Sequence, residues 1–70
     1  MYIKNLIKLR KKNRLTQEGL ARKANISYHT LIKIESGGIE NPKIETLIKL
    51  SDALEVTIDE LIGRSKERGI

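Results

Sequence analysis

The stretch QEGLARKANISYHTLIKIE, residues 17–35, decides the fold of this chain. Thr16 and Ser27 each precede a run with apolar residues at helical spacing, so their hydroxyls are placed to cap two helices. Between these helices lies Asn25, one of the few residues that tolerates the left-handed conformation of a sharp turn. The stretch therefore predicts two short helices joined by a tight turn.

Apolar residues flank both predicted caps. Leu15 and Leu20 stand around the first cap, and Ile26 and Leu31 stand around the second. Each pair has the N′ and N4 spacing of a hydrophobic staple, which fixes how the chain enters a helix. The small side chain of Ala21 lets the two helices approach closely.

These residues resemble the helix-turn-helix of the Cro and phage-repressor family of DNA-binding proteins. The similarity extends from about Leu6 to Leu61, which is most of the chain. It implies an all-α, compact five-helix repressor-like domain in which the second and third helices form the helix-turn-helix. The residues that carry it are Thr16, Gln17, Glu18, Gly19, Leu20, Ala21, Asn25, Ile26, Ser27, Leu31, Ile34, Glu35 and Gly37.

The length and composition restrict the classes of function. Seventy residues allow one domain, residues 1–63, followed by a short charged tail, residues 64–70, that we expect to be frayed. The absence of cysteine excludes disulfides and thiolate metal sites. With one histidine and no carboxylates at metal or acid–base spacing, we expect no catalytic residue, metal, cofactor or small-molecule ligand.

The net charge of +5 is unevenly distributed. Residues 1–14 contain six basic groups and no acid, whereas residues 15–63 contain five basic and eight acidic groups. This asymmetry favours an anionic partner, nucleic acid before acidic lipid, although a basic end is also typical of a solvated surface. Lys4 and Lys8 interrupt the first apolar run, so we expect a cytoplasmic protein without a membrane-spanning segment.

The spacing of apolar residues and the N-cap residues predict the first, fourth and fifth helices. Residues 2–13 predict an amphipathic first helix, and Thr57 with Glu60 predicts a capping box for a short fifth helix. Asn41 and Pro42 fit the N-cap and first position of the fourth helix. We assign to the core face of that helix Ile44, Leu47, Ile48, Leu50, Ala53 and Leu54.

Two positions depart from the resemblance at helix ends. Arg14 and Glu55 stand where family members often have glycine, and a side chain in a left-handed conformation costs roughly 1 kcal/mol. Asn13 is the alternative residue for the positive φ after the first helix. Gly19 is a third departure, because a glutamate there would complete a capping box with Thr16.

The resemblance also implies an ion pair between Arg10 and Glu35. A guanidinium can bind a carboxylate bidentately, which would tie the first helix to the third. The alternative is that Arg10 is one more surface cation.

The third predicted helix, residues 27–35, divides into two faces. Leu31 and Ile34 face the core, and the other side carries polar groups near the N-terminus, as major-groove reading requires. Histidine or tyrosine in such a place is also compatible with simple exposure or local packing. The base-reading candidates are Tyr28, His29, Thr30 and Lys33.

The resemblance assigns phosphate contacts to helix N-termini and to the loop before the fourth helix. Gln17 corresponds to a family glutamine that binds the DNA backbone. For Lys43, the alternative to a phosphate contact is entry into the minor groove. The phosphate-binding candidates are Thr16, Gln17, Ser27, Gly38, Asn41 and Lys43.

These observations predict a sequence-specific, double-stranded DNA-binding transcriptional regulator that acts as a repressor. We expect a homodimer on an inverted repeat, with Val56, Ile58 and Ile62 as the candidate dimer surface. The alternative is an antitoxin-like module that binds a partner protein and represses its own promoter.

Overall fold

The computed structural model describes residues 3–63 of the chain, so the predicted tail, residues 64–70, lies outside the described residues. The described part is all-α, as the sequence predicts, and contains no strand. Its elements are α1 (Lys4–Lys12), α2 (Gln17–Ala24), α3 (Tyr28–Ser36), α4 (Ile44–Leu54) and α5 (Ile58–Ile62).

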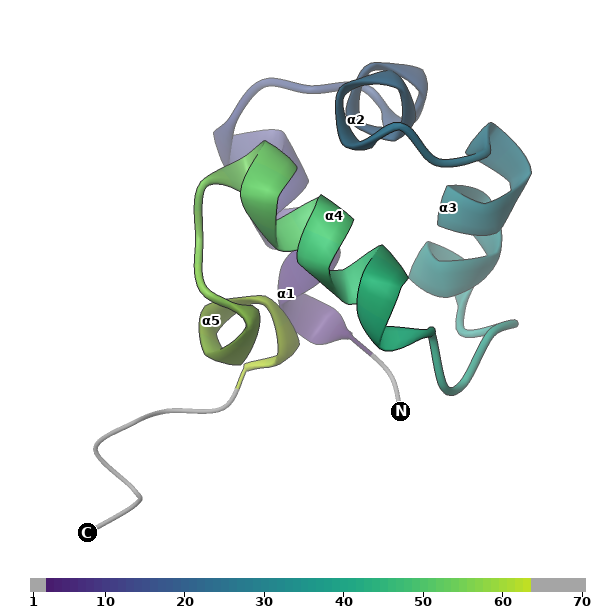
Figure 1. Cartoon of the computed structure of the whole chain (residues 1–70). Coiled ribbons are helices and arrows are strands. Elements are labelled where there is room, and N and C mark those ends of the chain that lie inside the picture. Colours follow the sequence, from purple (N-terminus) through teal and green to yellow (C-terminus); the bar gives the residue numbers. More distant parts are fainter. Residues whose placement is uncertain (1–2, 64–70) are drawn as a thin grey trace, which may run out of the picture.

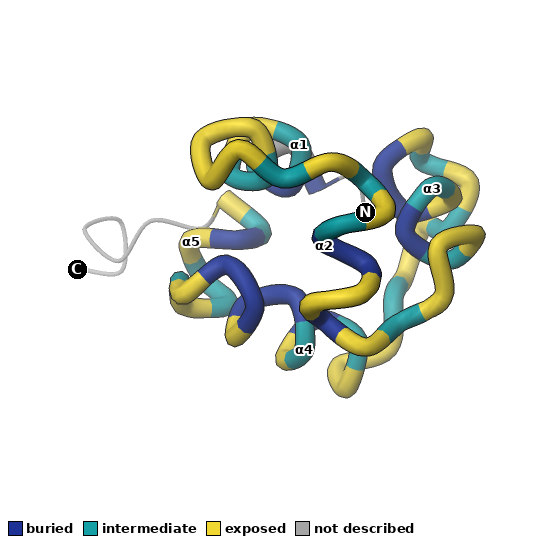
Figure 2. Tube along the Cα trace, turned by 90° about the horizontal axis from the view of Figure 1, so that it is seen from above, coloured by how far each residue is buried: buried dark blue, intermediate teal, exposed yellow. Residues whose placement is uncertain are grey.

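The helices enclose one core. Helix α2 packs on α3 and α4, while α1 packs on α5 and α3, and α4 also contacts α5. In Figure 1, α3 and α5 lie on opposite sides of the molecule, with α4 running diagonally between them in front of α1. Figure 2 shows that the buried segments of the helices face the centre.

Each helix contributes one fully buried leucine to this core. These are Leu6, Leu20, Leu31, Leu50 and Leu61, whose exposed fractions are all 0%. Burial of such a side chain stabilises the folded state by about 1.5–3 kcal/mol. Five helices joined in this way form one hydrophobic core, and the outer face of α3 remains available to solvent.

The two predicted helix-turn-helix caps are confirmed. Thr16 Oγ1 accepts from the Gly19 N–H at 2.9 Å, and Ser27 Oγ accepts from the His29 N–H at 3.2 Å. Asn25, which ends α2, is left-handed with φ 58°. Its neighbour Ile26 packs against the core, so the tight turn fixes the angle between α2 and α3.

The positive φ after α1 belongs to Arg14 and not to Asn13. Arg14 has φ 59°, whereas Asn13 has φ −87° and ends α1. The Asn13 side chain donates to the Leu9 carbonyl at 2.8 Å, which holds it in the helical turn. Glu55 after α4 has φ 57°, so a charged side chain takes the left-handed position at both of these helix ends.

Helix α4 begins two residues later than predicted. Lys43 is its N-cap, with φ −64° and ψ 149°, and the first helical hydrogen bond joins the Leu47 N–H to the Lys43 carbonyl at 3.1 Å. The prediction from Asn41 and Pro42 is therefore wrong. A proline ring fixes φ but not ψ, so Pro42 fits an extended segment as well as a first helical position.

The assignment of Ile44 and Ile48 to the core is also wrong. Ile44 is 62% exposed and Ile48 is 44% exposed. The core side of α4 is made by Leu47, Leu50, Ala53 and Leu54, as assigned. The apolar stripe in the sequence is wider than the face that the neighbouring helices cover. No helix within residues 3–63 has the length and apolarity needed to cross a membrane.

Candidate nucleic-acid interface

Helix α3 packs against the core through one of its faces. Leu31 and Ile34 are buried at 0% and 2% exposure, and both belong to the core. Tyr28, His29 and Lys33 are exposed. Because residues three and four apart share a helix face, burial of this pair turns the remaining side of α3 outward.

The N-terminal turn of α3 presents two rings. The centroids of Tyr28 and His29 lie 6.0 Å apart, with the ring planes inclined by 54°. The separation lies within the range of about 4.5–7 Å at which aromatic rings interact. Together with the half-buried Thr30 and the exposed Lys33, the rings provide hydroxyl, imidazole and ammonium groups on one short surface. These groups can donate to or accept from base edges.

The ion pair between Arg10 and Glu35 is present and nearly buried. Arg10 Nε lies 2.8 Å from Glu35 Oε2, and Arg10 Nη2 donates to Glu35 Oε1 at 3.2 Å. Only 12% of the Arg10 side chain and 4% of the Glu35 side chain are exposed. The remaining Arg10 group, Nη1, donates to the Leu15 carbonyl at 2.9 Å. The Arg10 guanidinium therefore ties α1 both to α3 and to the α1–α2 connection.

Gln17 joins the same cluster. Its Nε2 donates to Glu35 Oε1 at 2.9 Å, a contact that the sequence analysis missed. The bond spans 18 residues in the chain, and no local pattern marks it. An amide nitrogen carries two hydrogens, so one remains for an acceptor outside the protein. The bond also fixes the side chain at the N-terminus of α2.

The two capping hydroxyls occupy exposed positions. Thr16 and Ser27 each use a hydroxyl oxygen to accept a helix N–H. A hydroxyl that accepts through one lone pair still has its own hydrogen to donate. Both hydroxyls therefore remain able to donate to an anion at the N-termini of α2 and α3, where helix dipoles favour negative charge.

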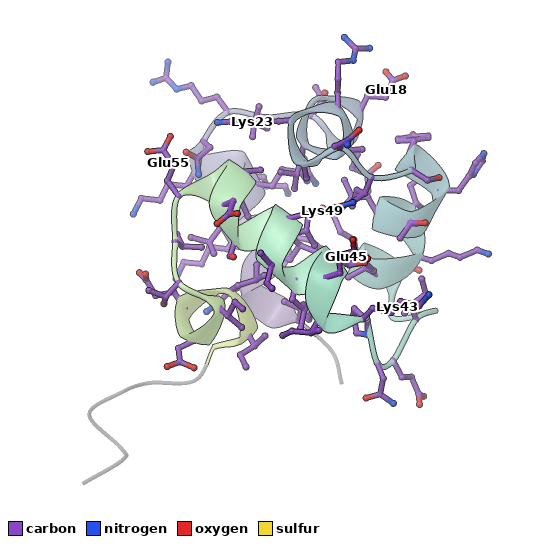
Figure 3. The ribbon with its side chains drawn as sticks, viewed as in Figure 1. Glu18, Lys23, Lys43, Glu45, Lys49 and Glu55 are labelled. Atoms are coloured by element: carbon purple, nitrogen blue, oxygen red, sulfur yellow. The ribbon has the colours of Figure 1, made fainter. Side chains whose placement is uncertain are left out.

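The α3–α4 connection, residues 37–43, places further candidates beside α3. Gly38, Asn41 and Lys43 are all exposed, and Figure 3 shows Lys43 at the start of α4. A hollow of about 340 Å³ separates α3 from α4. Its lining consists of Thr30, Ile39, Asn41, Pro42, Lys43 and Thr46.

This hollow brings together one base-reading candidate, Thr30, and two phosphate candidates, Asn41 and Lys43. Thr46 also lines it, although the sequence analysis did not select that residue. Thr46 stands between Ile44 and Leu47, both assigned to the core from the sequence, and no motif marks it as a binding residue.

The three residues expected at the dimer surface are only half-buried. Val56 and Ile62 pack against the core, and Ile58 is also partly covered. Two apolar side chains on α4, Ile44 and Ile48, are more exposed than these three.

Comparisons with known proteins agree with this geometry. A model of the helix-turn-helix family matches residues 6–61. An uncharacterized HTH-type transcriptional regulator of Bacillus subtilis (strain 168), YqaE, is 39% identical over 69 residues, which are 97% of this chain and 59% of that protein. The comparison with solved structures found no match.

Two further relatives are similar to this chain. The cryptic phage CTXphi transcriptional repressor RstR of Vibrio cholerae serotype O1 (strain ATCC 39315 / El Tor Inaba N16961) is 48% identical over 50 residues, which are 70% of this chain and 43% of that protein. The HTH-type transcriptional regulator AnsR of Bacillus subtilis (strain 168) is 35% identical over 68 residues, covering 97% of this chain and 58% of that protein. The chain thus spans between 43% and 59% of the length of these relatives. It belongs to the helix-turn-helix family, of the Cro and phage-repressor type.

Proposed function

We propose that this chain binds double-stranded DNA in a sequence-specific manner and regulates transcription, with α3 in the major groove. The observation that carries the proposal is the orientation of α3, in which Leu31 and Ile34 are buried while Tyr28, His29 and Lys33 are exposed. A recognition helix needs this division, because its N-terminal outer side must reach base edges while its inner side holds it rigidly.

One group of side chains reads the bases, and a second group contacts the phosphates. Lys33 donates to guanine O6 or N7, and Thr30 offers a methyl group to thymine or a hydroxyl to either class of base. Phosphate contacts from the N-termini of α2 and α3 and from the α3–α4 connection set the orientation of the protein on the duplex. The bond from Gln17 to Glu35 supports this role, because it holds the Gln17 amide in place before DNA arrives.

Two copies of the chain act together on an inverted repeat. Helix α3 has nine residues and is therefore about 14 Å long, enough for only a few base pairs. A two-fold dimer with half-sites about 34 Å apart doubles the sequence that is read. The repressor role is supported by RstR, a relative whose name describes a transcriptional repressor.

Selection of bound duplexes from a random pool tests this function directly. We expect enrichment of an inverted repeat, and binding that weakens steeply as the salt concentration rises. A pool that yields no enriched duplex at low salt would refute sequence-specific binding.

Three variants on a selected duplex separate base reading from phosphate binding. Lys33→Ala should cost about 1–3 kcal/mol and relax the preference at one base position. Lys43→Ala should weaken all sites similarly and reduce the salt slope by about 1. Lys23→Ala is the matched control, since Lys23 is an exposed lysine on the opposite side of the molecule from Lys43 (Figure 3). Equal effects of Lys43→Ala and Lys23→Ala would contradict the assigned interface.

A further inference from the structure

The outer face of α3 carries one line of exposed side chains. His29 and Lys33 are four residues apart, and Ser36 follows three residues later, so all three lie on the same side of the helix. Each of them is exposed, whereas Leu31 and Ile34 on the opposite side are buried. This line, here called the α3 outer line, points most directly away from the core.

Tyr28 and Thr30 border the α3 outer line on either side. Tyr28 stands three residues before the buried Leu31, so it lies near the edge where α3 meets the core. Thr30 is half-buried and lines the hollow toward α4. The groups that face a base pair most directly are therefore those of the α3 outer line.

Hydrogen-bond donors dominate this line. The Ser36 hydroxyl donates to the Lys33 carbonyl at 3.2 Å, so its hydrogen is used within the helix. The Lys33 ammonium has three donors and no acceptor, and the His29 imidazole always has at least one ring N–H to donate. The two ring nitrogens of an imidazole point in diverging directions. One imidazole therefore cannot donate to and accept from the same base edge.

Helix α3 offers no carboxylate or amide to a base edge. Glu35 is its only acid, and 4% of that side chain is exposed. Both carboxylate oxygens are occupied, Oε2 by Arg10 and Oε1 by Arg10 and Gln17. The sequence of α3 also contains no aspartate, asparagine, glutamine or arginine. Carboxylates accept from cytosine N4 and amides bind adenine bidentately, so α3 lacks the side chains that select those two bases.

Guanine is the base that these donors fit best. In the major groove guanine presents two acceptors, N7 and O6, whereas adenine presents one acceptor beside an amino group and thymine presents one acceptor beside a methyl group. Cytosine presents an amino group. A donor that faces an amino group leaves two donors opposed and unpaired, which lowers affinity for that base. The α3 outer line therefore favours guanine, which alone has two acceptors side by side.

We infer that His29 and Lys33 read two guanines at neighbouring positions of each half-site, so that His29 determines specificity together with Lys33. Residues four apart in a helix are separated by about 6 Å along its axis. Base pairs are stacked about 3.4 Å apart, so side chains with this separation reach base pairs one or two steps apart. The inference rests on the proposed function and specifies the bases that its recognition helix prefers.

Guanine analogues in the duplex selected from the random pool test the inference. 7-Deazaguanine lacks the N7 acceptor, whereas hypoxanthine keeps N7 and O6 and lacks only the amino group in the minor groove. We expect 7-deazaguanine at either guanine to weaken binding about tenfold, and hypoxanthine to change it by less than about twofold. Equal affinities for the 7-deazaguanine duplex and the guanine duplex would overturn the inference.

Protein variants assign each guanine to its side chain. At one position, 7-deazaguanine should weaken binding by the unmodified protein and by Lys33→Ala but not by His29→Ala, and the reverse should hold at the other position. Ser36→Ala is the matched control on the same outer line, because the Ser36 hydroxyl is bound within the helix, and it should keep both effects. Persistence of both effects in His29→Ala and in Lys33→Ala would mean that other residues contact the guanines, and the inference would fail.

The base assignment and the proposed function can fail separately. Enrichment of an inverted repeat whose half-sites lack two guanines one or two steps apart would refute the roles of His29 and Lys33 and would leave sequence-specific binding intact. A pool from which no duplex is enriched would refute the proposed function, and this inference with it.

Discussion

The connections α1–α2, α2–α3 and α4–α5 are built alike, whereas the α3–α4 connection is not. Each of the first three contains a left-handed residue, then a partly buried apolar residue, then a hydroxyl residue that caps the next helix. The apolar N–H also bonds back five residues into the preceding helix, at 2.9–3.1 Å. The three tripeptides are Arg14-Leu15-Thr16, Asn25-Ile26-Ser27 and Glu55-Val56-Thr57.

The α3–α4 connection lacks most of this construction. Gly37, with φ 87°, ends α3, and the Ile39 N–H bonds to the Lys33 carbonyl at 3.1 Å. The chain then runs to Lys43, an N-cap without a side-chain hydrogen bond. Three short connections thus hold the helices at fixed angles, whereas the fourth leaves the side chains of Asn41 and Lys43 exposed beside α3, where a ligand could use them.

The largest expected effect comes from breaking the ion pair that supports the first connection. Arg10→Ala removes both bonds to Glu35 and the bond to the Leu15 carbonyl. Within residues 3–63, it leaves the buried Glu35 carboxylate with the Gln17 amide as its remaining partner. The free energy of unfolding should fall by about 3 kcal/mol or more, and the Tm by more than about 10 °C. Thermal unfolding followed by circular dichroism measures this change.

Two controls define what that result means. Lys11→Ala removes a neighbouring exposed cation and should change stability by less than about 0.5 kcal/mol. Arg10→Lys keeps the charge but not the bidentate geometry, so its loss should be intermediate. If Arg10→Ala and Lys11→Ala had equal effects, the pair would not be a main source of stability.

The next largest effects separate the two kinds of connection. Thr16→Ala and Ser27→Ala each remove a capping acceptor and should cost about 1 kcal/mol of stability. Lys43→Ala at the uncapped α4 should leave stability nearly unchanged, because its side chain makes no capping hydrogen bond. Urea unfolding of the three variants gives the comparison. A destabilisation by Lys43→Ala as large as that of the caps would remove the distinction.

The short connections were predictable because their signals are local. A hydroxyl residue, the apolar residue directly before it and a second apolar residue four positions after it occur together around Thr16, Ser27 and Thr57. Each signal acts within one helical turn, where local geometry decides the structure. The ion pair between Arg10 and Glu35 was expected from the resemblance alone, since residues 25 apart give no periodic signal.

The features that the sequence did not predict depend on packing between distant elements. Helix α4 begins at Ile44, and Leu47 and Leu50 on it are buried against the other helices, whereas Pro42 is compatible with either start. The exposure of Ile44 and Ile48 likewise depends on which neighbours cover α4. The contact of Gln17 with Glu35 requires α2 and α3 to be already in place.

A smaller change in stability, in this case an increase, is expected at Arg14, the left-handed residue after α1. Arg14→Gly should raise the free energy of unfolding by about 0.5–1 kcal/mol, because glycine adopts φ 59° without strain from a Cβ atom. Asn13→Gly is the matched control. Asn13 has φ −87° and donates to the Leu9 carbonyl, so glycine there should destabilise the protein. If both changes had the same sign, left-handed strain would not explain the difference.

The smallest effect should arise at Gly19, where two terms nearly cancel. Alanine inside a helix is favoured over glycine by about 1 kcal/mol. A Cβ atom at position 19 would lie 3.1 Å from Thr16 Oγ1, and that hydroxyl is held by its bond from the Gly19 N–H. Gly19→Ala should therefore change stability by less than about 0.5 kcal/mol.

A double-mutant cycle shows whether this cancellation is the cause. In a Thr16→Ala background the crowded hydroxyl is absent, so Gly19→Ala should become stabilising by about 1 kcal/mol. The difference between the two backgrounds measures how firmly the cap of α2 holds its geometry. An equal effect of Gly19→Ala in both backgrounds would mean that the α1–α2 connection yields easily to a nearby methyl group. The short connections would then be less rigid than their hydrogen bonds indicate, and the contrast with the α3–α4 connection would rest on capping alone.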